Sequence, residues 1–337
     1  MKMFLELNKE LYYHRFDIRI VSTESVRFIG WSGAVIRNNL IYASRQIQIK
    51  ENKTLENIIN EVTLNEDHPL YKELNNGFPK GYILAFPELT GQQQDGMHIN
   101  KGELFIFSLI LIGRMVQYRF KFFEAVQRMC EHGLGYPIQS FKLVDISENN
   151  PKGPHRLVVA GKETIESELH FPVSLSDYAR FQASGNQHRL LIQYLTPVCL
   201  YKQHPKIDRR QSYQDKCNGF PSFYQLVRSA AYRLLKLTIL YLSPEDTELP
   251  EQLNEYIEEY IENASVPVLT QCNIQRITPQ NTLKKEAPNR MTLSGYIGEQ
   301  VYEGLFNHYL PLLGFMEELG VGNEVVYGMG RYEVKVG

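Results

Sequence analysis

The sequence predicts an α+β fold in which one β-α-β-β-α-β unit occurs twice and each unit forms an antiparallel sheet. Three observations support this prediction. The chain has 337 residues, about twice the length of an ordinary small domain. Segments with the periodicity of strands and helices follow one another in the same order in both halves. The second helix of each half ends in a pair of glycines, in "EHGLGY" and in "ELGVGN".

The first half begins with a strand, because residues 14–21, "HRFDIRIV", alternate between polar and apolar side chains. After an interval long enough for a helix, residues 100–113, "NKGELFIFSLILIG", predict a longer strand that is apolar on both faces. Apolar residues from Phe122 to Met129 then recur at helical spacing. A strand around residues 139–146 completes the unit.

The second half shows the same order of elements. Residues 188–200, "HRLLIQYLTPVCL", predict its first strand, and an apolar stripe over residues 222–242 predicts the helix that follows. Residues 289–302, "NRMTLSGYIGEQVY", predict a further strand. Residues 305–322 predict a helix closed by glycine, and residues 328–336, "GMGRYEVKV", predict the last strand.

This repeat predicts two tandem ferredoxin-like (RRM-like) domains, which we place at residues 1–182 and 183–337. A composition of 43% hydrophobic and 22% charged residues is typical of a soluble globular protein. The net charge of -2 neither supports nor excludes binding to RNA. A role in RNA binding therefore depends on a local basic surface.

The cysteines and the N-terminal segment bear on the cellular compartment. The four cysteines lie far apart without a CxxC pair, a pattern typical neither of a zinc site nor of a dense disulfide framework. Glu6, Lys9 and Glu10 stand where a signal peptide needs an uninterrupted apolar segment. No later segment approaches the ~18 uncharged apolar residues of a membrane span. We therefore expect a cytoplasmic protein that does not cross a membrane.

Residues 319–337, "LGVGNEVVYGMGRYEVKVG", raise the question of why so many glycines stand beside the last strand. These glycines are Gly320, Gly322, Gly328 and Gly330. A helix C-cap explains the first pair, as it does the pair that ends the helix of the first half, but it does not explain the second pair. A nucleotide-binding loop is excluded by the order of elements, because its glycines precede a helix N-terminus, whereas here a helix precedes and a strand follows.

A second function of such a loop is to bring backbone amides close to the phosphates and sugars of a polynucleotide. The neighbouring side chains that we expect to hydrogen-bond or stack there are Asn323, Tyr327 and Arg331. The segment "SGYIGEQVYEGLFNHYLPLLGFMEELGVGNEVVYGMGRYEV" resembles the C-terminal signature of the CRISPR-associated precursor-crRNA processing endoribonucleases, the Cas-six family of the RAMP superfamily. The shared pattern is G-hydrophobic-G, five residues, G-hydrophobic-G.

The resemblance extends over most of the chain. "LIQYLTPVCLYKQ" resembles the family's "TP" strand, "FYQLVRSAAYRLLKL" the helix after it, and "WSGAVIRNNLIYAS" the family's first helix. "HPLYKELN", "YILAFPEL" and "KGELFIFSLILIG" also lie where the family has an equivalent segment. A chance match to all these segments in order is not plausible.

The resemblance implies that the chain binds CRISPR repeat RNA in a groove between or across the two domains and cleaves it without a metal ion or cofactor. The nucleophile is the RNA's own 2′-hydroxyl, and the products carry a 2′,3′-cyclic phosphate and a 5′-hydroxyl. Further partners that it implies are a CRISPR effector complex, or fused or associated adaptation proteins. The alternative function is that of a non-catalytic RNA-binding RAMP subunit of an effector complex. An unrelated tandem ferredoxin-like protein that uses its sheet for protein contacts is a third possibility.

Cleavage of this kind needs a base, an acid and a cation. The family often places a histidine near the first helix, but residues 24–50 contain none. We expect Arg37, Tyr42 and Arg45 to take catalytic roles instead, and a solvated helix face is the alternative interpretation.

His98 is the histidine for which we expect a catalytic role, because "QQDGMHINKGE" is loop-like, contains Lys101 and precedes a long strand. A surface histidine is the alternative interpretation. Other histidines, His132 among them, stand in no recognisable constellation.

The stretch "YKQHPKIDRRQSYQDK", residues 201–216, interleaves basic and aromatic residues, as RNA-binding segments do. A long solvated loop has the same composition. The RNA contacts that we expect in it are Lys202, Arg209 and Arg210. Arg276, in "QRITPQ", falls where some relatives carry an arginine-rich segment that contacts RNA, and we expect it to bind RNA as well.

Overall fold

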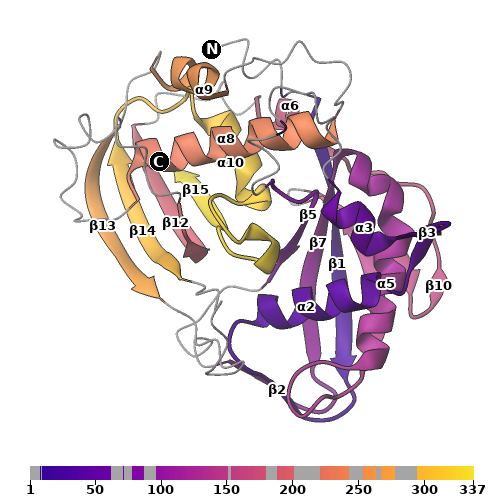
Figure 1. Ribbon diagram of the computed structural model, residues 1–337. Coiled ribbons are helices and arrows are strands. Elements are labelled where there is room, and N and C mark those ends of the chain that lie inside the picture. Colours follow the sequence, from indigo (N-terminus) through magenta and orange to yellow (C-terminus); the bar gives the residue numbers. More distant parts are fainter. Residues whose placement is uncertain are drawn as a thin grey trace.

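The structure is a computed structural model, and Figure 1 shows its two sheets beside each other, each with its own helices. It describes residues 8, 10–61, 71, 78–86, 96–150, 153–179, 188–200, 221–242, 253–262, 267–277 and 294–337. The predicted domain boundary between residues 182 and 183 lies outside these ranges.

The first half contains one complete β-α-β-β-α-β unit. Its elements are β1 (Tyr12–Ser22), α2 (Ser32–Ser44), β5 (Tyr82–Ala85), β7 (Leu104–Ile112), α5 (Arg119–His132) and β8 (Phe141–Asn149). The strands pair antiparallel in the order β8-β1-β7-β5, which is the strand order of a ferredoxin-like sheet. The sheet is extended by β9 (His155–Ala160), β10 (Glu163–Thr164) and β11 (Val173–Ser174).

Smaller elements connect the main ones. They are β2 (Val26–Phe28), β3 (Gln48–Lys50), β4 (Lys53–Thr54), α3 (Leu55–Asn60), β6 (Met97–Ile99), η2 (Gly113–Tyr118) and α6 (Leu175–Ala179). Two of them, β2 and β6, pair with each other outside the main sheet.

The alternation in β1 decides which face of the first sheet is covered. Phe16 and Ile18 are fully buried, and the ring of Phe16 lies 5.1 Å from that of Phe123 on α5. Arg15 and Asp17 point to the other face because successive side chains of a strand alternate.

The second half repeats the unit with β12 (Arg189–Val198), α8 (Phe223–Tyr241), β13 (Val268–Ile277), β14 (Gly295–Glu303), α10 (Leu310–Leu319) and β15 (Tyr332–Val336). It also contains α9 (Leu253–Glu262) and η4 (Val325–Tyr327). The strands pair antiparallel in the order β13-β14-β12-β15, again the ferredoxin-like order. The predicted α+β fold of two tandem ferredoxin-like units is confirmed.

Local sequence explains where α8 begins. Ser222 and Gln225 form a reciprocal capping box, in which the Gln225 N–H donates to Ser222 Oγ (3.2 Å) and the Ser222 N–H donates to Gln225 Oε1 (2.9 Å). These bonds satisfy backbone donors that a helix N-terminus leaves without a partner.

The bounds of several predicted elements were wrong. The predicted strand at 100–113 begins only at Leu104, and the one at 289–302 begins only at Gly295. The predicted helix at 305–322 is shorter, because α10 starts at Leu310 with a proline in its first turn.

Side chains from both halves meet at Glu318 on α10. Arg15 Nη1 donates to Glu318 Oε2 at 2.8 Å, and Arg331 Nη2 lies 3.8 Å from Glu318 Oε1. Arg331 Nη1 also donates to the carbonyl oxygen of Phe86, at 3.2 Å. We call Arg15, Glu318 and Arg331 the Glu318 latch, because it joins β1 of the first half to the end of the second.

The C-terminal end of α8 packs on the first half as well. The Tyr241 hydroxyl donates to the carbonyl oxygen of Pro79 at 3.1 Å. None of the helices in the described ranges has both the length and the apolar composition that crossing a membrane requires.

Candidate nucleic-acid interface

The four glycines between α10 and β15 share one backbone conformation. Gly320, Gly322, Gly328 and Gly330 have φ values of 69°, 77°, 76° and 79°, in the left-handed region that favours glycine. All four are buried, and we call residues 320–330 the glycine loop. A Cβ on Gly328 would overlap the ring of Phe86 and lie 2.9 Å from the carbonyl oxygen of Leu84. The glycine loop is therefore packed tightly against β5 and the residue that follows it.

The amides of these glycines all donate hydrogen bonds within the protein. Their acceptors are Met316 O (2.8 Å) for Gly320, Ser229 Oγ (3.1 Å) for Gly322, Val325 O (2.9 Å) for Gly328 and Pro197 O (3.0 Å) for Gly330. A phosphate can accept from one of them only if an internal bond breaks. The four glycines thus first of all shape the loop, and direct contact between them and RNA stays a prediction.

The glycine loop also packs against α2 of the first half. Trp31 Nε1 donates to the carbonyl oxygen of Tyr327, and Trp31 packs with Met329. The guanidinium of Arg37 lies 4.6 Å from the centre of the Tyr327 ring. Arg37 thus faces the glycine loop, and its catalytic role stays a prediction.

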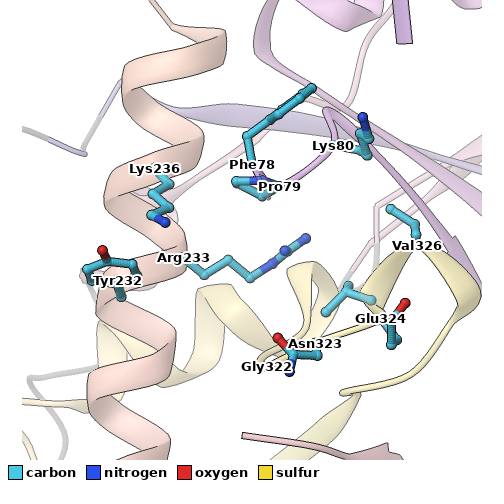
Figure 2. A pocket seen from close by; sticks show the side chains of 11 residues that line it. Phe78, Pro79, Lys80, Tyr232, Arg233, Lys236, Gly322, Asn323, Glu324 and Val326 are labelled. Carbon is cyan, nitrogen blue, oxygen red and sulfur yellow. The ribbon is translucent and has the colours of Figure 1, made fainter. Parts of the chain in front are cut away.

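A pocket of about 380 Å³ opens between the two halves beside the glycine loop. Figure 2 shows its side chains and Arg233 extending from α8 into its middle. The lining comes from three segments and comprises Phe78, Pro79, Lys80, Tyr232, Arg233, Lys236, Gly322, Asn323, Glu324, Val325 and Val326. Because it contains three cationic side chains and a single carboxylate, we call it the basic pocket.

The environment of the pocket lowers the pKa of Lys80. Burial, and then the positive charge of Arg37, lower the pKa of Lys80 to about 8. Its Nζ donates to Asn60 Oδ1 at 3.1 Å and lies 3.9 Å from the centre of the Phe78 ring. Near neutral pH the ammonium is charged but poorly hydrated, so a phosphate oxygen is a favourable partner for it.

The opposite wall of the pocket combines charge and aromatic surface. Lys236 is only 8% exposed, and its ammonium lies 4.4 Å from the centre of the Tyr232 ring. Arg233 Nε donates to the carbonyl oxygen of Leu319 at 3.1 Å, which fixes the side chain across the pocket. Burial raises the pKa of Glu324, and the charge of Arg37 opposes part of that effect. Cations for phosphates and rings for bases thus line one cavity.

The predicted catalytic residues of α2 do not gather in one place. Arg37 faces the glycine loop, whereas Tyr42 packs edge-on against His132 of α5, with ring centres 5.6 Å apart. Arg45 Nε is paired with Glu56 Oε1 at 2.9 Å. Since each residue of a helix turns by about 100°, Arg37 and Tyr42 point about 140° apart.

His98 lies on β6, exposed, opposite Arg27 of β2. Among the described residues, no hydrogen bond, ion pair or ring contact connects it to Arg37, Tyr42 or Arg45. Its catalytic role stays a prediction, and so do those of the three α2 residues.

The predicted RNA contacts have different outcomes. Asn323 lines the basic pocket. Arg331 is largely buried in the Glu318 latch, and Arg276 lies exposed on β13, with Nη2 3.4 Å from Ser294 Oγ. Lys202, Arg209 and Arg210 lie outside the described residues.

Sequence analysis did not single out the three cationic side chains that line the basic pocket. The sequence did indicate that Arg233 faces away from the core, because it lies off the apolar stripe of its helix, on the side where charged side chains are usually found. His132, which the sequence analysis placed in no recognisable constellation, lies beside Tyr42 in the structure. Within the described part of the chain, no group of three His, Cys, Asp or Glu side chains is arranged to hold a metal ion.

Two family models match the chain. Residues 192–332 match CRISPR-associated endoribonuclease Cas6, and residues 11–170 match the AF_1859 N-terminal domain. No curated protein matches the chain in sequence.

Solved structures match nearly the whole chain. Two Cas6-RT-Cas1–Cas2 complexes, one of them partial, have a TM-score of 0.60 and 13% identity over 97% of this chain. The chain spans only 46% and 29% of the length of those two chains. A Cas6 product complex has a TM-score of 0.52 and 13% identity, covering 96% of this chain and 100% of its own. At this identity the structural likeness shows the fold.

Proposed function

The chain belongs to the Cas6 family of the RAMP superfamily, and from this premise we propose that it binds the repeat RNA of CRISPR transcripts and cleaves it in the cytoplasm to give mature crRNA. The observation that carries the proposal is the basic pocket between the two halves. Its cations match the phosphates of a polynucleotide, and its aromatic rings match unstacked bases. The net charge of the chain gave no sign of this surface.

The proposed reaction uses the RNA's own 2′-hydroxyl and needs no metal ion. The 2′-oxygen attacks the adjacent phosphorus, the bond from phosphorus to the 5′-oxygen breaks, and the products carry a 2′,3′-cyclic phosphate and a 5′-hydroxyl. The protein contributes a group that takes the 2′-hydroxyl proton, a group that protonates the leaving oxygen, and a cation for the phosphorane charge.

A second candidate function is that of a non-catalytic RNA-binding subunit of a CRISPR effector complex. The observation that favours it is the lack of histidine in residues 24–50, which contain the whole of α2. Both candidates need the basic pocket, but only the first needs an acid and a base.

Cleavage assays separate the two candidates. The purified protein is incubated with its host's repeat RNA in EDTA, beside a substrate with a 2′-deoxynucleotide at the cut site. We expect cleavage of the unmodified RNA alone. Tight binding without cleavage would support the non-catalytic subunit, and cleavage of the deoxy substrate would contradict the proposed chemistry.

Binding assays test the pocket itself. Lys236→Met keeps an aliphatic side chain in the buried position but removes its charge. A charge-assisted contact is worth about 1.5–3 kcal/mol, so we expect the affinity for RNA to fall by about tenfold or more. The slope of log affinity against log salt concentration should become shallower by about one, because one phosphate contact is lost. Lys335→Met is the matched control, because Lys335 is exposed on β15, where it bonds to Gln193. Equal loss in both variants would show that the pocket is not where RNA binds.

We also propose that the chain acts together with CRISPR adaptation proteins, either fused to it or associated with it. Support comes from the two similar Cas6-RT-Cas1–Cas2 complexes. Co-purification of the chain with its host's Cas1 and Cas2 tests this proposal, and separate elution from a sizing column at micromolar concentrations would contradict it.

A further inference from the structure

A second cluster of polar side chains lies where the C-terminal ends of α2 and α5 meet, away from the basic pocket's lining. Tyr42 is 51% exposed, and His132, the last residue of α5, is exposed as well. Their ring centres are 5.6 Å apart and their planes are inclined by 74°. The Tyr42 hydroxyl and the His132 imidazole, two groups that can exchange protons, thus lie side by side at the surface.

A neighbouring amide orients the histidine ring. His132 Nε2 lies 3.1 Å from Gln46 Oε1. An amide oxygen only accepts hydrogen bonds, so Nε2 carries the proton and donates it, and Nδ1 holds a lone pair. No hydrogen bond from a described residue occupies Nδ1. The arrangement is that of a base held in one tautomer by a third group.

Arg128 in turn holds the backbone at Gln46. Arg128 Nη1 donates to the carbonyl oxygen of Gln46 at 3.2 Å, and Arg128 Nη2 donates to Glu124 at 2.8 Å. Arg128 thus fixes the residue whose side chain orients the His132 ring.

A cation stands next to the pair. Arg45 follows Tyr42 by three residues, and its side chain is 59% exposed and paired with Glu56. Exposed ion pairs contribute little to stability, so the guanidinium is able to exchange this carboxylate for a phosphate. The cluster therefore offers a base, a hydroxyl and a cation.

We propose that His132 and Tyr42 are the proton-transferring pair of the RNA cleavage, with Arg45 as the cation that faces the phosphorane. This inference rests on the proposed function. Nδ1 of His132 takes the proton of the 2′-hydroxyl while the 2′-oxygen attacks phosphorus. The bond to the 5′-oxygen breaks, and that oxygen takes the proton of the Tyr42 hydroxyl. Solvent then removes the proton from His132 and returns one to Tyr42, so no oxidant, reductant or co-reactant is needed.

The assignment accounts for the missing histidine of α2. The helix supplies the tyrosine and the arginine, and α5 supplies the histidine from a position about 90 residues later in the chain. By contrast, His14 is buried, and its Nδ1 is 2.6 Å from Glu148 Oε1.

Single-turnover cleavage of the repeat RNA in EDTA, between about pH 5 and pH 9, tests the assignment. For His132→Ala we expect a rate at least about 100-fold lower than wild type, an unchanged Kd for the RNA, and loss of the acidic limb of the pH–rate profile. Added imidazole should restore part of the rate. His155→Ala is the matched control, because His155 is an exposed histidine of the same half, on β9, and should keep the wild-type rate.

A substrate with sulfur in place of the 5′-bridging oxygen separates the two roles. A thiolate leaves without protonation, so Tyr42→Phe should be slow on the natural substrate and near wild type on the sulfur substrate. His132→Ala should stay slow on both. His132→Gln is the second variant if the alanine variant does not fold.

The outcomes distinguish this inference from the proposed function. If wild type cleaves and both His132 variants cleave as fast, the assignment is overturned and the proposed function stands. If wild type binds the RNA and never cleaves it, the proposed cleavage fails and the assignment fails with it. If Tyr42→Phe is equally slow on both substrates, Tyr42 is not the acid.

Discussion

Replacing Gly328 by alanine tests whether the glycine loop is built for packing between the two halves. Gly328 has a φ of 76°, and a Cβ there would overlap the Phe86 ring and lie 2.9 Å from Leu84 O. A left-handed alanine costs about 1–2 kcal/mol, and forcing a methyl group into a packed site costs about 1–3 kcal/mol more. We therefore expect the free energy of unfolding in urea to fall by about 2–5 kcal/mol.

Gly102 provides a matched control for this substitution. Its φ is also 76°, but a Cβ there would have nothing within 4 Å. Gly102→Ala should therefore show only the conformational cost of about 1–2 kcal/mol. If Gly328→Ala lost no more stability than Gly102→Ala but bound RNA much more weakly, the packing explanation would be refuted and direct contact between Gly328 and RNA would be favoured.

Three further predictions concern charges and coupling. Because burial and Arg37 lower the pKa of Lys80 to about 8, its ammonium is lost as the pH rises from about 7 to 9, and RNA affinity should fall by up to about tenfold over that range, measured by fluorescence anisotropy. Glu318→Gln removes the carboxylate of the Glu318 latch and leaves two largely buried guanidinium groups, so we expect urea unfolding to show a loss of about 3 kcal/mol. The third prediction is a double-mutant cycle on single-turnover rates. The activation free-energy changes of Arg37→Ala and His132→Ala should add within about 0.5 kcal/mol, because the two residues share no contact. Those of Tyr42→Phe and His132→Ala should not add, because these two residues are in contact.

Each of these predictions has a control. Lys80→Arg keeps its charge throughout, so the same pH dependence in that variant would show that another group titrates. Glu333→Gln breaks an exposed ion pair with Lys335 and should cost less than about 1 kcal/mol; a loss equal to that of Glu318→Gln would mean that the latch is no stronger than a surface pair. Strong coupling between Arg37 and His132 would place both in one site.

The sequence predicted the central elements of the fold because their side chains face one environment along their whole length. From His14 to Ser22, β1 alternates between buried and more exposed residues, and α8 buries a continuous stripe. β13 escaped prediction because it is the edge strand of its sheet, and most of its ten residues are exposed or half-buried, so no apolar alternation marks it. β5 escaped for the opposite reason, since its four residues are all buried and give no period.

The site was harder to predict than the fold, because its parts come from distant segments. The basic pocket needs residues 78–80, α8 and residues 322–326, and no local pattern brings these together. The separation of Arg37 from Tyr42 was implicit in the helical period, but which of them faces the second half is decided only by packing between the halves. The contact between His132 and Tyr42 depends on the packing of α5 against α2, which no local pattern predicts.

The helix α2 connects the glycine loop to the proposed catalytic pair, which would give the loop a role in cleavage without direct contact to RNA. One side of α2 meets the loop, where Gly33 leaves room for the carbonyl oxygen of Tyr327 and Trp31 donates to that oxygen. The other side carries Tyr42 against α5. Since the helix is rigid, the packing of the loop fixes the position of Tyr42 relative to the basic pocket, which the loop also lines. On the proposed assignment of His132 and Tyr42, the glycines would act on cleavage by setting the distance between the pocket proposed to bind RNA and the pair proposed to cleave it.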